Sequence, residues 1–261
     1  TFTPRVPSET EADLAVLRKM PQAAPHEFTV TAGPNGTIAL TLSPEAMEAR
    51  ARSAIAQSIE IVRRRIDGTG AIDPEITRQG DDRIVVELPG VSDPERIKNL
   101  LGTTAKMTFR LVDANPMHAS APPPGVTLLP MYDSNDSTTL PVYDHVDVDG
   151  TSLTNAAATI DSDSGGWAVA FSLDSTGAHA FSDITRAHVG ERFAIVLDNK
   201  VVEAAVIRGP ITGGNGQITG GFNKDSATNL ALMLNAGALP APLTVVEQRT
   251  IGPSLGAASI R

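Results

Sequence analysis

The chain has 261 residues, no cysteine, 41% apolar residues and a formal net charge of −9. It is too apolar and too moderately charged for a disordered protein, so we expect a folded core in one large domain or two small ones. The missing cysteines exclude a disulfide framework, a zinc finger and a thiol nucleophile. The acidic balance argues against nucleic acid or an anionic membrane surface as a partner.

The sequence begins at Thr1 without a signal peptide, and it has no run of about 18 apolar residues that could span a bilayer. Its longest uncharged stretch, residues 226–246, is interrupted by asparagine, glycine and proline. This stretch is expected to form a short helix followed by a strand. We therefore expect a fragment of a longer protein that does not itself insert into a membrane.

The first predicted element is a hairpin of residues 28–31 and 37–42, joined by a Gly-Pro-Asn-Gly turn. Ser43 then caps a long amphipathic helix that has Pro44 in its first turn and ends at Gly68 and Gly70. One apolar stripe follows this helix at steps of three and four residues: Met47, Ala51, Ile55, Ile59, Val62 and Ile66.

Strands at 75–79 and 83–88, a short helix and a strand at 105–112 follow. The short helix is expected to begin at Ser92, which stands at capping-box spacing from Glu95. From residue 37 to residue 112 the order is therefore β-α-β-β-α-β. This order predicts an α+β fold with a split βαβ, ferredoxin-like part.

The second half of the chain has its own predicted elements. Residues 113–166 give little regular signal, but 167–173 read as a strand and Asp174 as the cap of the next helix. A hairpin is expected at 193–197 and 200–207. Asp225 is then expected to cap a further helix, and 243–251 to form the last strand.

The net charge arises in the middle of the chain. Residues 113–222 hold four basic and 13 acidic side chains, whereas the flanking segments nearly cancel. Proline and glycine clusters mark both ends of this stretch. We therefore expect an N-terminal linker at 1–26, a base subdomain built from 27–112 and 223–261, and an inserted α+β head subdomain at 113–222.

No motif predicts a catalytic residue, a cofactor or a metal. Residues 147–150 and 161–165 resemble the opening of a calcium loop, but position twelve of the second is Ser172 instead of glutamate, so both are expected to be turns. The head histidines, His118, His145, His179 and His188, have no zincin or triad spacing. A soluble periplasmic hydrolase that uses Asp and His residues of the head, such as Asp174 and His179, is the alternative function.

The only basic cluster is Arg63-Arg64-Arg65. Three successive helical positions face three directions, so this cluster is not expected to form one patch for nucleic acid.

Several segments together resemble the sequence blocks of SecD, a membrane subunit that assists the Sec protein-export channel. The blocks occur in the family's order and lie at 63–68, 78–80, 83–91, 102–105 with 109–112, 218–222, 234–243 and 247–256. The family-motif residues among them are Glu87, Pro89, Gly90, Arg249, Gly252, Pro253 and Gly256. Asp67 stands where the family usually has asparagine, and residues 113–160 match poorly.

The resemblance implies the first large periplasmic domain of a multi-pass protein, on the periplasmic side of the bacterial inner membrane, without enzymatic activity. It implies unfolded preprotein as a partner, and SecF and the SecYEG channel as partners through the full-length protein. The head would hold preprotein and move relative to the base, driven by proton flow. We expect the hinge in two connections: Val112, Asp113, Ala114, Asn115 and Pro116, and then Gly220, Gly221, Phe222 and Asn223. A purely structural assembly module is a third possibility.

Overall fold

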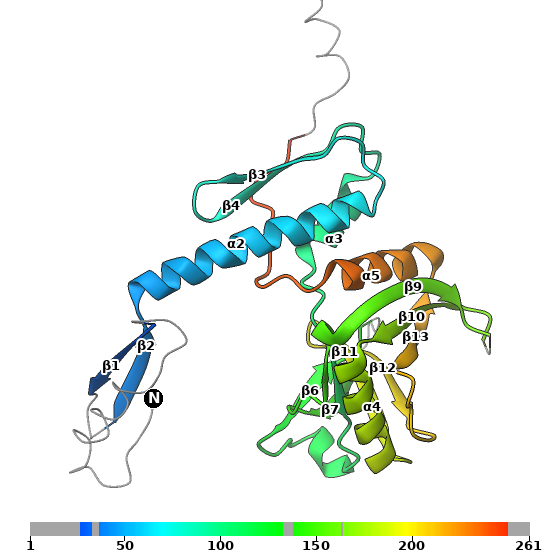
Figure 1. Cartoon of the computed structure of the whole chain (residues 1–261). Coiled ribbons are helices and arrows are strands. Elements are labelled where there is room, and N and C mark those ends of the chain that lie inside the picture. Colours follow the sequence, from blue (N-terminus) through cyan, green and yellow to red (C-terminus); the bar gives the residue numbers. More distant parts are fainter. Residues whose placement is uncertain (1–26, 33–36, 133–137, 163, 250–261) are drawn as a thin grey trace, which may run out of the picture. The chain divides into compact units, whose positions relative to one another are not determined.

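The structure is a computed structural model, and it describes residues 27–32, 37–132, 138–162 and 164–249. These residues form the predicted α+β fold (Figure 1). The chain divides into two compact units, each described by itself below. One comprises Thr1–Ile59 and Ile76–Val86, and the other Glu60–Glu75 and Glu87–Arg261. No helix in the described ranges is both long and apolar enough to cross a membrane.

The first unit begins with the predicted hairpin. Strands β1 (Phe28–Ala32) and β2 (Ile38–Leu42) pair antiparallel, and Val30 and Ile38 form their small buried cluster. Two further strands, β3 (Glu75–Gln79) and β4 (Arg83–Glu87), pair with each other as a separate two-stranded sheet. Both hairpins are therefore confirmed.

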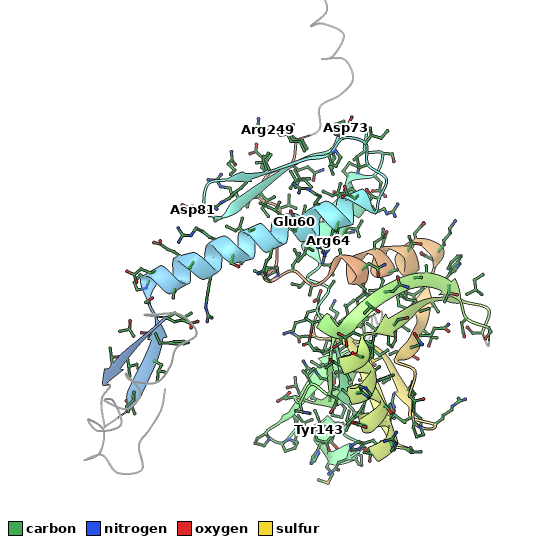
Figure 2. All side chains as sticks on the ribbon, viewed as in Figure 1. Glu60, Arg64, Asp73, Asp81, Tyr143 and Arg249 are labelled. Carbon is green, nitrogen blue, oxygen red and sulfur yellow. The ribbon has the colours of Figure 1, made fainter. Side chains whose placement is uncertain are left out.

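Helix α2 (Pro44–Asp67) links the two units and begins as predicted, with the Ser43 hydroxyl accepting the Ala46 N–H at 3.1 Å. Its apolar stripe is buried only toward the C-terminal end: Met47 is 59% exposed, whereas Ile66 is 1% exposed. Glu60 and Arg64 are exposed on this helix (Figure 2).

Helix α3 (Pro94–Gly102) starts one residue later than predicted. Its N-cap is Asp93 and not Ser92, because the Asp93 carboxylate accepts the Arg96 N–H at 3.0 Å and Pro94 occupies the first turn.

The second unit contains two sheets that share one core, which we call the sheet core (residues 107–236). One sheet has the order β12-β11-β5-β8 and the other β13-β10-β9. The strands are β5 (Met107–Leu111), β8 (Val148–Asp149), β9 (Leu153–Ile160), β10 (Trp167–Leu173), β11 (Arg192–Leu197), β12 (Lys200–Val206) and β13 (Asn215–Phe222).

Four phenylalanines fill the space between these sheets. The Phe109 ring lies 5.3 Å from that of Phe171, 5.5 Å from that of Phe181 and 6.0 Å from that of Phe193. They come from β5, β10, helix α4 (Ser175–Ala187) and β11, so the core unites segments distant in sequence. Helix α5 (Lys224–Ala236) adds Leu230 and runs along β9 (Figure 1).

A smaller layer covers the other side of the four-stranded sheet. Strands β6 (Val126–Pro130) and β7 (Thr139–Tyr143) pair antiparallel, and their buried Leu129 and Val142 pack on the valines of β11 and β12. Two single turns, η3 (Pro116–Ala119) and η4 (Gly150–Ser152), precede β6 and β9.

The β-α-β-β-α-β order predicted for residues 37–112 is present, but its strands do not form one sheet within the described residues. β2 pairs with β1, β3 pairs with β4, and β5 pairs with β11 and β8. The burial of the strands explains the difference. Met107, Thr108 and Phe109 of β5 are all buried, as in an inner strand, whereas β3 is mostly exposed.

Two further expectations near the end of the chain are wrong. Helix α5 is capped by Asn223 and not by Asp225, because Asn223 and Ser226 form a reciprocal capping box. Residues 243–249, expected as a strand, form none in the structure. Val246, at 80% exposed, shows that the segment lacks the packing that a strand needs.

Candidate functional site

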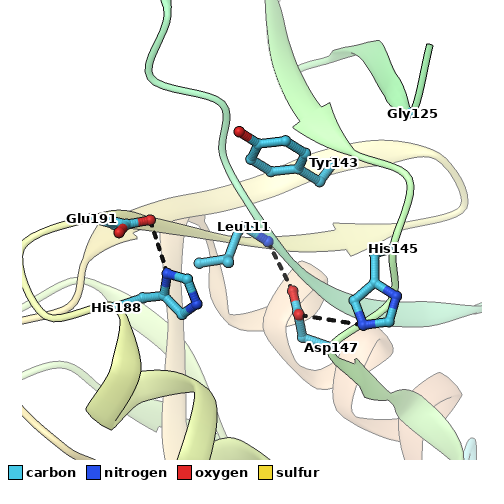
Figure 3. Close-up of a pocket in the computed structure, with 7 residues that line it drawn as sticks. All are labelled: Leu111, Gly125, Tyr143, His145, Asp147, His188 and Glu191. Atoms are coloured by element: carbon cyan, nitrogen blue, oxygen red, sulfur yellow. Dashed lines mark hydrogen bonds and ion pairs between the residues drawn. The ribbon is translucent and has the colours of Figure 1, made fainter.

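A pocket of about 390 Å³ opens at one end of the sheet core. Strands β5 and β7, the segment before β8 and the end of α4 bring its walls together (Figure 3). Its lining residues are Leu111, Gly125, Tyr143, His145, Asp147, His188 and Glu191. Three of the acidic and histidine side chains that the sequence offered for chemistry, at 145, 147 and 188, therefore meet in one place.

Asp147 forms the buried wall of this pocket. Its carboxylate accepts the Leu111 N–H at 3.0 Å and lies 3.8 Å from Nε2 of His145, which is itself exposed. Burial raises the pKa of Asp147, against the opposing effects of the Leu111 N–H and of His145 and His188. The group is thus a carboxylate whose charge the protein stabilises incompletely.

The opposite wall carries a second imidazole–carboxylate pair. His188 ends helix α4 as its C-cap, and its Nδ1 lies 3.0 Å from Oε2 of Glu191 (Figure 3). Tyr143, 40% exposed on β7, adds an aromatic face. The pocket thus combines acidic, aromatic and aliphatic surface. Polar groups beside apolar surface in one pocket suit the binding of a ligand.

The hydrolase alternative gains no support from the geometry. Asp174 is the N-cap of α4 and accepts the Gly177 N–H at 2.7 Å. His179 is exposed, and in the described part of the chain no hydrogen bond or ion pair joins it to a carboxylate. Asp174 therefore has a capping role, and the two residues do not form a catalytic pair.

Neither calcium-loop segment is a calcium loop in the described residues: 147–150 includes strand β8 and the start of η4, and 161–165, of which residue 163 lies outside the described residues, is a turn. Asp149 caps η4 by accepting the Thr151 N–H, and Asp161 accepts the N–H of Ser164. Among the described residues, no group of three His, Cys, Asp or Glu side chains is placed to hold a metal ion.

The first predicted hinge segment packs against the sheet core. Val112 and Asp113 are buried, and their N–H groups donate to Arg192 O and Pro141 O, each at 3.0 Å. The Asp113 carboxylate accepts the Asn115 N–H and pairs with Nδ1 of His118, and these contacts lower the pKa of Asp113. Ala114 and Pro116 are exposed.

The second predicted hinge segment is the end of β13 and the start of α5. Between the pairs Val169↔Ile218 and Trp167↔Phe222 the ladder is irregular, which places Gly220 and Gly221 in a bulge of β13. Gly220 has a φ of 142°, which favours glycine. The hinge role of both segments stays a prediction.

The family-motif residues that the structure describes lie in turns and exposed segments. Glu87 ends β4, and Pro89 and Gly90 form the following turn, with Gly90 at a φ of 70°. Arg249 donates to Glu247 at 2.6 Å. Gly252, Pro253 and Gly256 lie outside the described residues.

The sequence patterns did not predict the role of Arg65, which is fully buried at the end of α2. Its guanidinium donates to four backbone carbonyls: Leu100 O at 2.6 Å, Thr103 O at 2.5 Å, Thr104 O at 3.1 Å and Gly237 O at 3.2 Å. Burial lowers the pKa of Arg65 to about 10, while the charge of Asp198 opposes this shift. We call this arrangement the Arg65 clasp.

The Arg65 clasp holds both chain segments that lead into and out of the sheet core. Residues 103–106 precede β5 and Gly237 follows α5, and Leu239 N donates to Thr104 O at 2.8 Å. From the sheet core, the Asp198 carboxylate accepts the Ala105 and Lys106 N–H groups at 2.9 and 2.8 Å. A signal was present in the sequence, because position 65 lies three residues after Val62 on the buried face of the helix.

Two family descriptions match the chain. "SecDF, P1 head subdomain" matches residues 127–241, and "Protein translocase subunit SecDF, P1 domain, N-terminal" matches residues 55–114. The head match therefore includes α5, which we had expected in the base.

Relatives carry the same description. The chain is 70% identical to protein translocase subunit SecD of Acetobacter pasteurianus over all 261 residues, covering 50% of that protein. It is 46% identical to SecD of Rhodobacter capsulatus, over 90% of this chain and 42% of that protein. The chain thus spans about half the length of the SecD proteins it matches.

Solved structures agree with this assignment. One, described as "Structure and function of a membrane component SecDF that enhances protein export", superposes with a TM-score of 0.62 at 32% identity. The match covers 77% of this chain and 94% of the other. A crystal structure of SecDF in a super-membrane-facing form also gives a TM-score of 0.62, at 25% identity, over 92% of this chain and 35% of that one.

Proposed function

The chain belongs to the SecD family of protein translocase subunits, in the part that carries the P1 domain, and from this we propose that it binds unfolded preprotein and assists its export. We place it on the periplasmic side of the inner membrane, with SecF and the SecYEG channel as partners of the full-length protein. The observation that carries the proposal is the match of all 261 residues to a SecD protein. The open pocket of the sheet core, which combines polar and apolar lining groups, supports it.

The second part of the proposal is that export, driven by the proton-motive force, uses a movement of head against base. The pairing of β5 with β11 and the packing of α5 on β9 support grouping β5 and α5 with the head strands. We therefore place the joint at residues 103–106 and 237–239, which the Arg65 clasp holds, as an alternative to the hinge predicted from sequence at 112–116 and 220–223. Two short segments that cross one boundary suit a hinge.

Photo-crosslinking in cells tests the preprotein contact. We would place p-benzoylphenylalanine at Tyr143, in the pocket, and as a matched control at Asp81, an exposed turn residue of the other unit (Figure 2). Each variant is expressed as full-length protein together with a stalled export intermediate. We expect a crosslink to the stalled preprotein from position 143 and none from position 81. If neither pocket nor sheet-core positions crosslink while export stays normal, the chain is an assembly module that does not touch preprotein.

A further inference from the structure

We propose that the outer edge of β9 binds an extended segment of unfolded polypeptide as an added β-strand, an inference that rests on the function proposed above. The site is the second half of this edge strand, Ala157–Ile160. It lies on a different part of the sheet core from the lining residues of the pocket. Backbone hydrogen bonds along a sheet edge recognise a polypeptide by its main chain, with little regard to its sequence.

The register of β9 shows which of its backbone groups point outward. β9 pairs antiparallel with β10, and among the described residues no strand lies on its other side. In such a ladder, hydrogen-bonded pairs alternate with pairs whose N–H and C=O groups face away. Asp161 N donates to Gly166 O at 2.8 Å, which fixes the alternation. The outward groups therefore belong to Ala156, Ala158 and Ile160.

The outward groups of Ala156 already bind an amide. Oδ1 of Asn235, on α5, accepts the Ala156 N–H at 2.7 Å, and Nδ2 of Asn235 donates to Ala156 O at 2.7 Å. A carboxamide has the donor and acceptor of a peptide bond, so Asn235 makes the two bonds that a residue of a neighbouring strand would make. It marks the edge as a surface that binds main-chain amides and shows where an added strand would begin.

Beyond Ala156 the edge is open. Among the described residues, the outward N–H and C=O groups of Ala158 and Ile160 have no hydrogen-bond partner. Ala157 is exposed, and the Ile160 side chain is 60% exposed. Two outward residues offer up to four main-chain hydrogen bonds, beside one apolar side chain that an extended segment would cover.

The other edges of the sheet core carry the protection that β9 lacks. Strand β12 has Lys200 and Glu203, and the Glu203 carboxylate accepts the Thr219 N–H of β13 at 2.6 Å, which joins the two strands. β13 is bulged, and β8 has only two residues. Charges, bulges and short strands are the usual means of blocking edge pairing. The eight residues of β9 include no charge and no proline.

A partner for such an edge must present a free main chain in extended form. Unfolded preprotein does so along its whole length, whereas folded proteins have their amides paired internally. The segments of different preproteins share no side-chain pattern, so main-chain recognition would serve all of them equally. We therefore assign the edge to extended preprotein, and pairing with a second copy of this chain becomes an outcome of the test.

The experiment measures fluorescence anisotropy of a labelled, uncharged ten-residue peptide rich in Thr and Val with the 261-residue chain. Ala158→Pro removes the outward N–H and places a ring on the edge, while leaving the bonds to β10 intact. We expect it to weaken peptide binding about tenfold or more. Ala158→Ser, which keeps the N–H, is the matched control and should bind like the unaltered chain. Circular dichroism and the unfolding midpoint confirm that both variants fold.

A second measurement makes the test independent of any variant. The same peptide, N-methylated at four consecutive residues, keeps its side chains but loses main-chain donors, and we expect the unaltered chain not to bind it. Equal binding of both peptides, or equal binding by Ala158→Pro, overturns the proposal. So does a chain that sedimentation shows to be a dimer through β9. Any of these results rejects the edge site alone when position 143 of the otherwise unaltered protein crosslinks to preprotein. Absence of every sheet-core crosslink in the otherwise unaltered protein rejects the proposed function itself.

Discussion

Arg65 shows how one side chain can fix the path of several chain segments through four carbonyls. A buried cation is costly unless its donors are satisfied, and here backbone carbonyls from α3, the start of β5 and the end of α5 satisfy them in place of a carboxylate. Only Nε lacks a partner among the described residues. Arginine suits this position because its planar fork can reach carbonyls on two sides at once.

We therefore expect Arg65→Met to destabilise the chain by about 2–4 kcal/mol, because four carbonyls lose their donor in a buried site. Arg65→Lys should recover only part of this loss, since an ammonium cannot match the fork geometry. Urea unfolding followed by circular dichroism measures both values. The control is Arg64→Met, one position away on the exposed side of the helix (Figure 2), which should change stability little. Equal effects at 64 and 65 would contradict the clasp.

Asp147 provides a second prediction at this scale. Since its pKa is raised in the folded chain, its ionisation opposes folding. The penalty is absent below the unfolded pKa of about 4 and grows as the pH rises through the folded value. Asp147→Asn keeps an oxygen to accept the Leu111 N–H but cannot ionise. We expect it to stabilise the chain at pH 7, on the order of 0.5 kcal/mol, and to have no such effect near pH 3.

The measurement is the free energy of unfolding of both proteins as a function of pH. Asp183→Asn, at an exposed carboxylate of α4 with a side chain 77% exposed, is the control for nonspecific charge effects. A stabilisation of Asp147→Asn that is the same at pH 3 and pH 7 would show that the ionised carboxylate is not its cause.

At the scale of elements, the contact between α5 and β9 depends on a polar pair as well as on apolar packing. Leu230 and Ala227 of α5 enter the common core, and Asn235 closes the end of the contact through its two bonds to Ala156. Because Ala156 is buried, its N–H and C=O groups would lack a hydrogen-bond partner from solvent if the Asn235 carboxamide were removed.

Asn235→Ala is therefore expected to destabilise the sheet core by about 1–3 kcal/mol. Asn235→Asp keeps the acceptor for the Ala156 N–H but loses the donor to Ala156 O. Its stability should therefore lie between that of the unaltered chain and that of Asn235→Ala. Amide hydrogen exchange at Ala156 offers a local readout and should become faster in Asn235→Ala. Unchanged exchange there would mean that the Asn235 bonds do not persist in solution.

Local patterns predicted β5, β10, β11, β12 and the two helices of the sheet core, but not β6 to β9 or β13. β10 and the β11–β12 hairpin alternate or carry turn residues, so each was evident from its own sequence. β9 was missed because Leu-Thr-Asn-Ala-Ala-Ala-Thr-Ile has neither strong alternation nor β-branched density. Its stability as a strand comes from β10 and α5, which neighbouring residues do not reveal. The segment 243–249 shows the opposite error. Its apolar residues predicted a strand, but no strand forms there, and no other strand pairs with it in the described residues.

The candidate site was predictable only as a list of residue types. The head histidines and aspartates were identified, but the burial of Asp147 depends on its contact with Leu111 of β5, which is distant in sequence. Strand β5 pairs with β11, more than 80 positions later, and no local signal carries that register. For the same reason the sequence does not show that β5 pairs with β11 or that α5 packs on β9.

At the scale of the whole molecule, the charge of −9 has a structural explanation. Seven acidic side chains between residues 113 and 222 accept backbone N–H groups, and so cap helices, hold turns or join strands: Asp113, Asp147, Asp149, Asp161, Asp174, Asp198 and Glu203. The acidity of this region is thus largely used inside the fold. We therefore do not need a long-range attraction of preprotein to explain it, and screening over about 8 Å at physiological salt would limit one.

The proposed joint at 103–106 and 237–239 makes a prediction about movement in the full-length protein. Arg96 lies on α3, which precedes residues 103–106, and Asn229 on α5, which precedes residues 237–239, and their Nε and Oδ1 are 3.0 Å apart. Arg96→Cys combined with Asn229→Cys places two thiols there, and the chain has no cysteine of its own to compete. We expect a short bifunctional thiol crosslinker to abolish most of the export stimulation by this double variant, because the connection can then no longer turn.

The matched controls are the uncrosslinked double variant and each single variant treated with the crosslinker. All three should stimulate export to the same extent. Residual export that equals the level without the protein would show that movement at this joint is required throughout the cycle. Full export by a quantitatively crosslinked protein would exclude rotation at 103–106 and 237–239. A second pair of cysteines, placed across the segments 112–116 and 220–223, would then test whether the movement occurs there. Only one of the two sets of connections can carry the main rotation if the sheet core moves as one body.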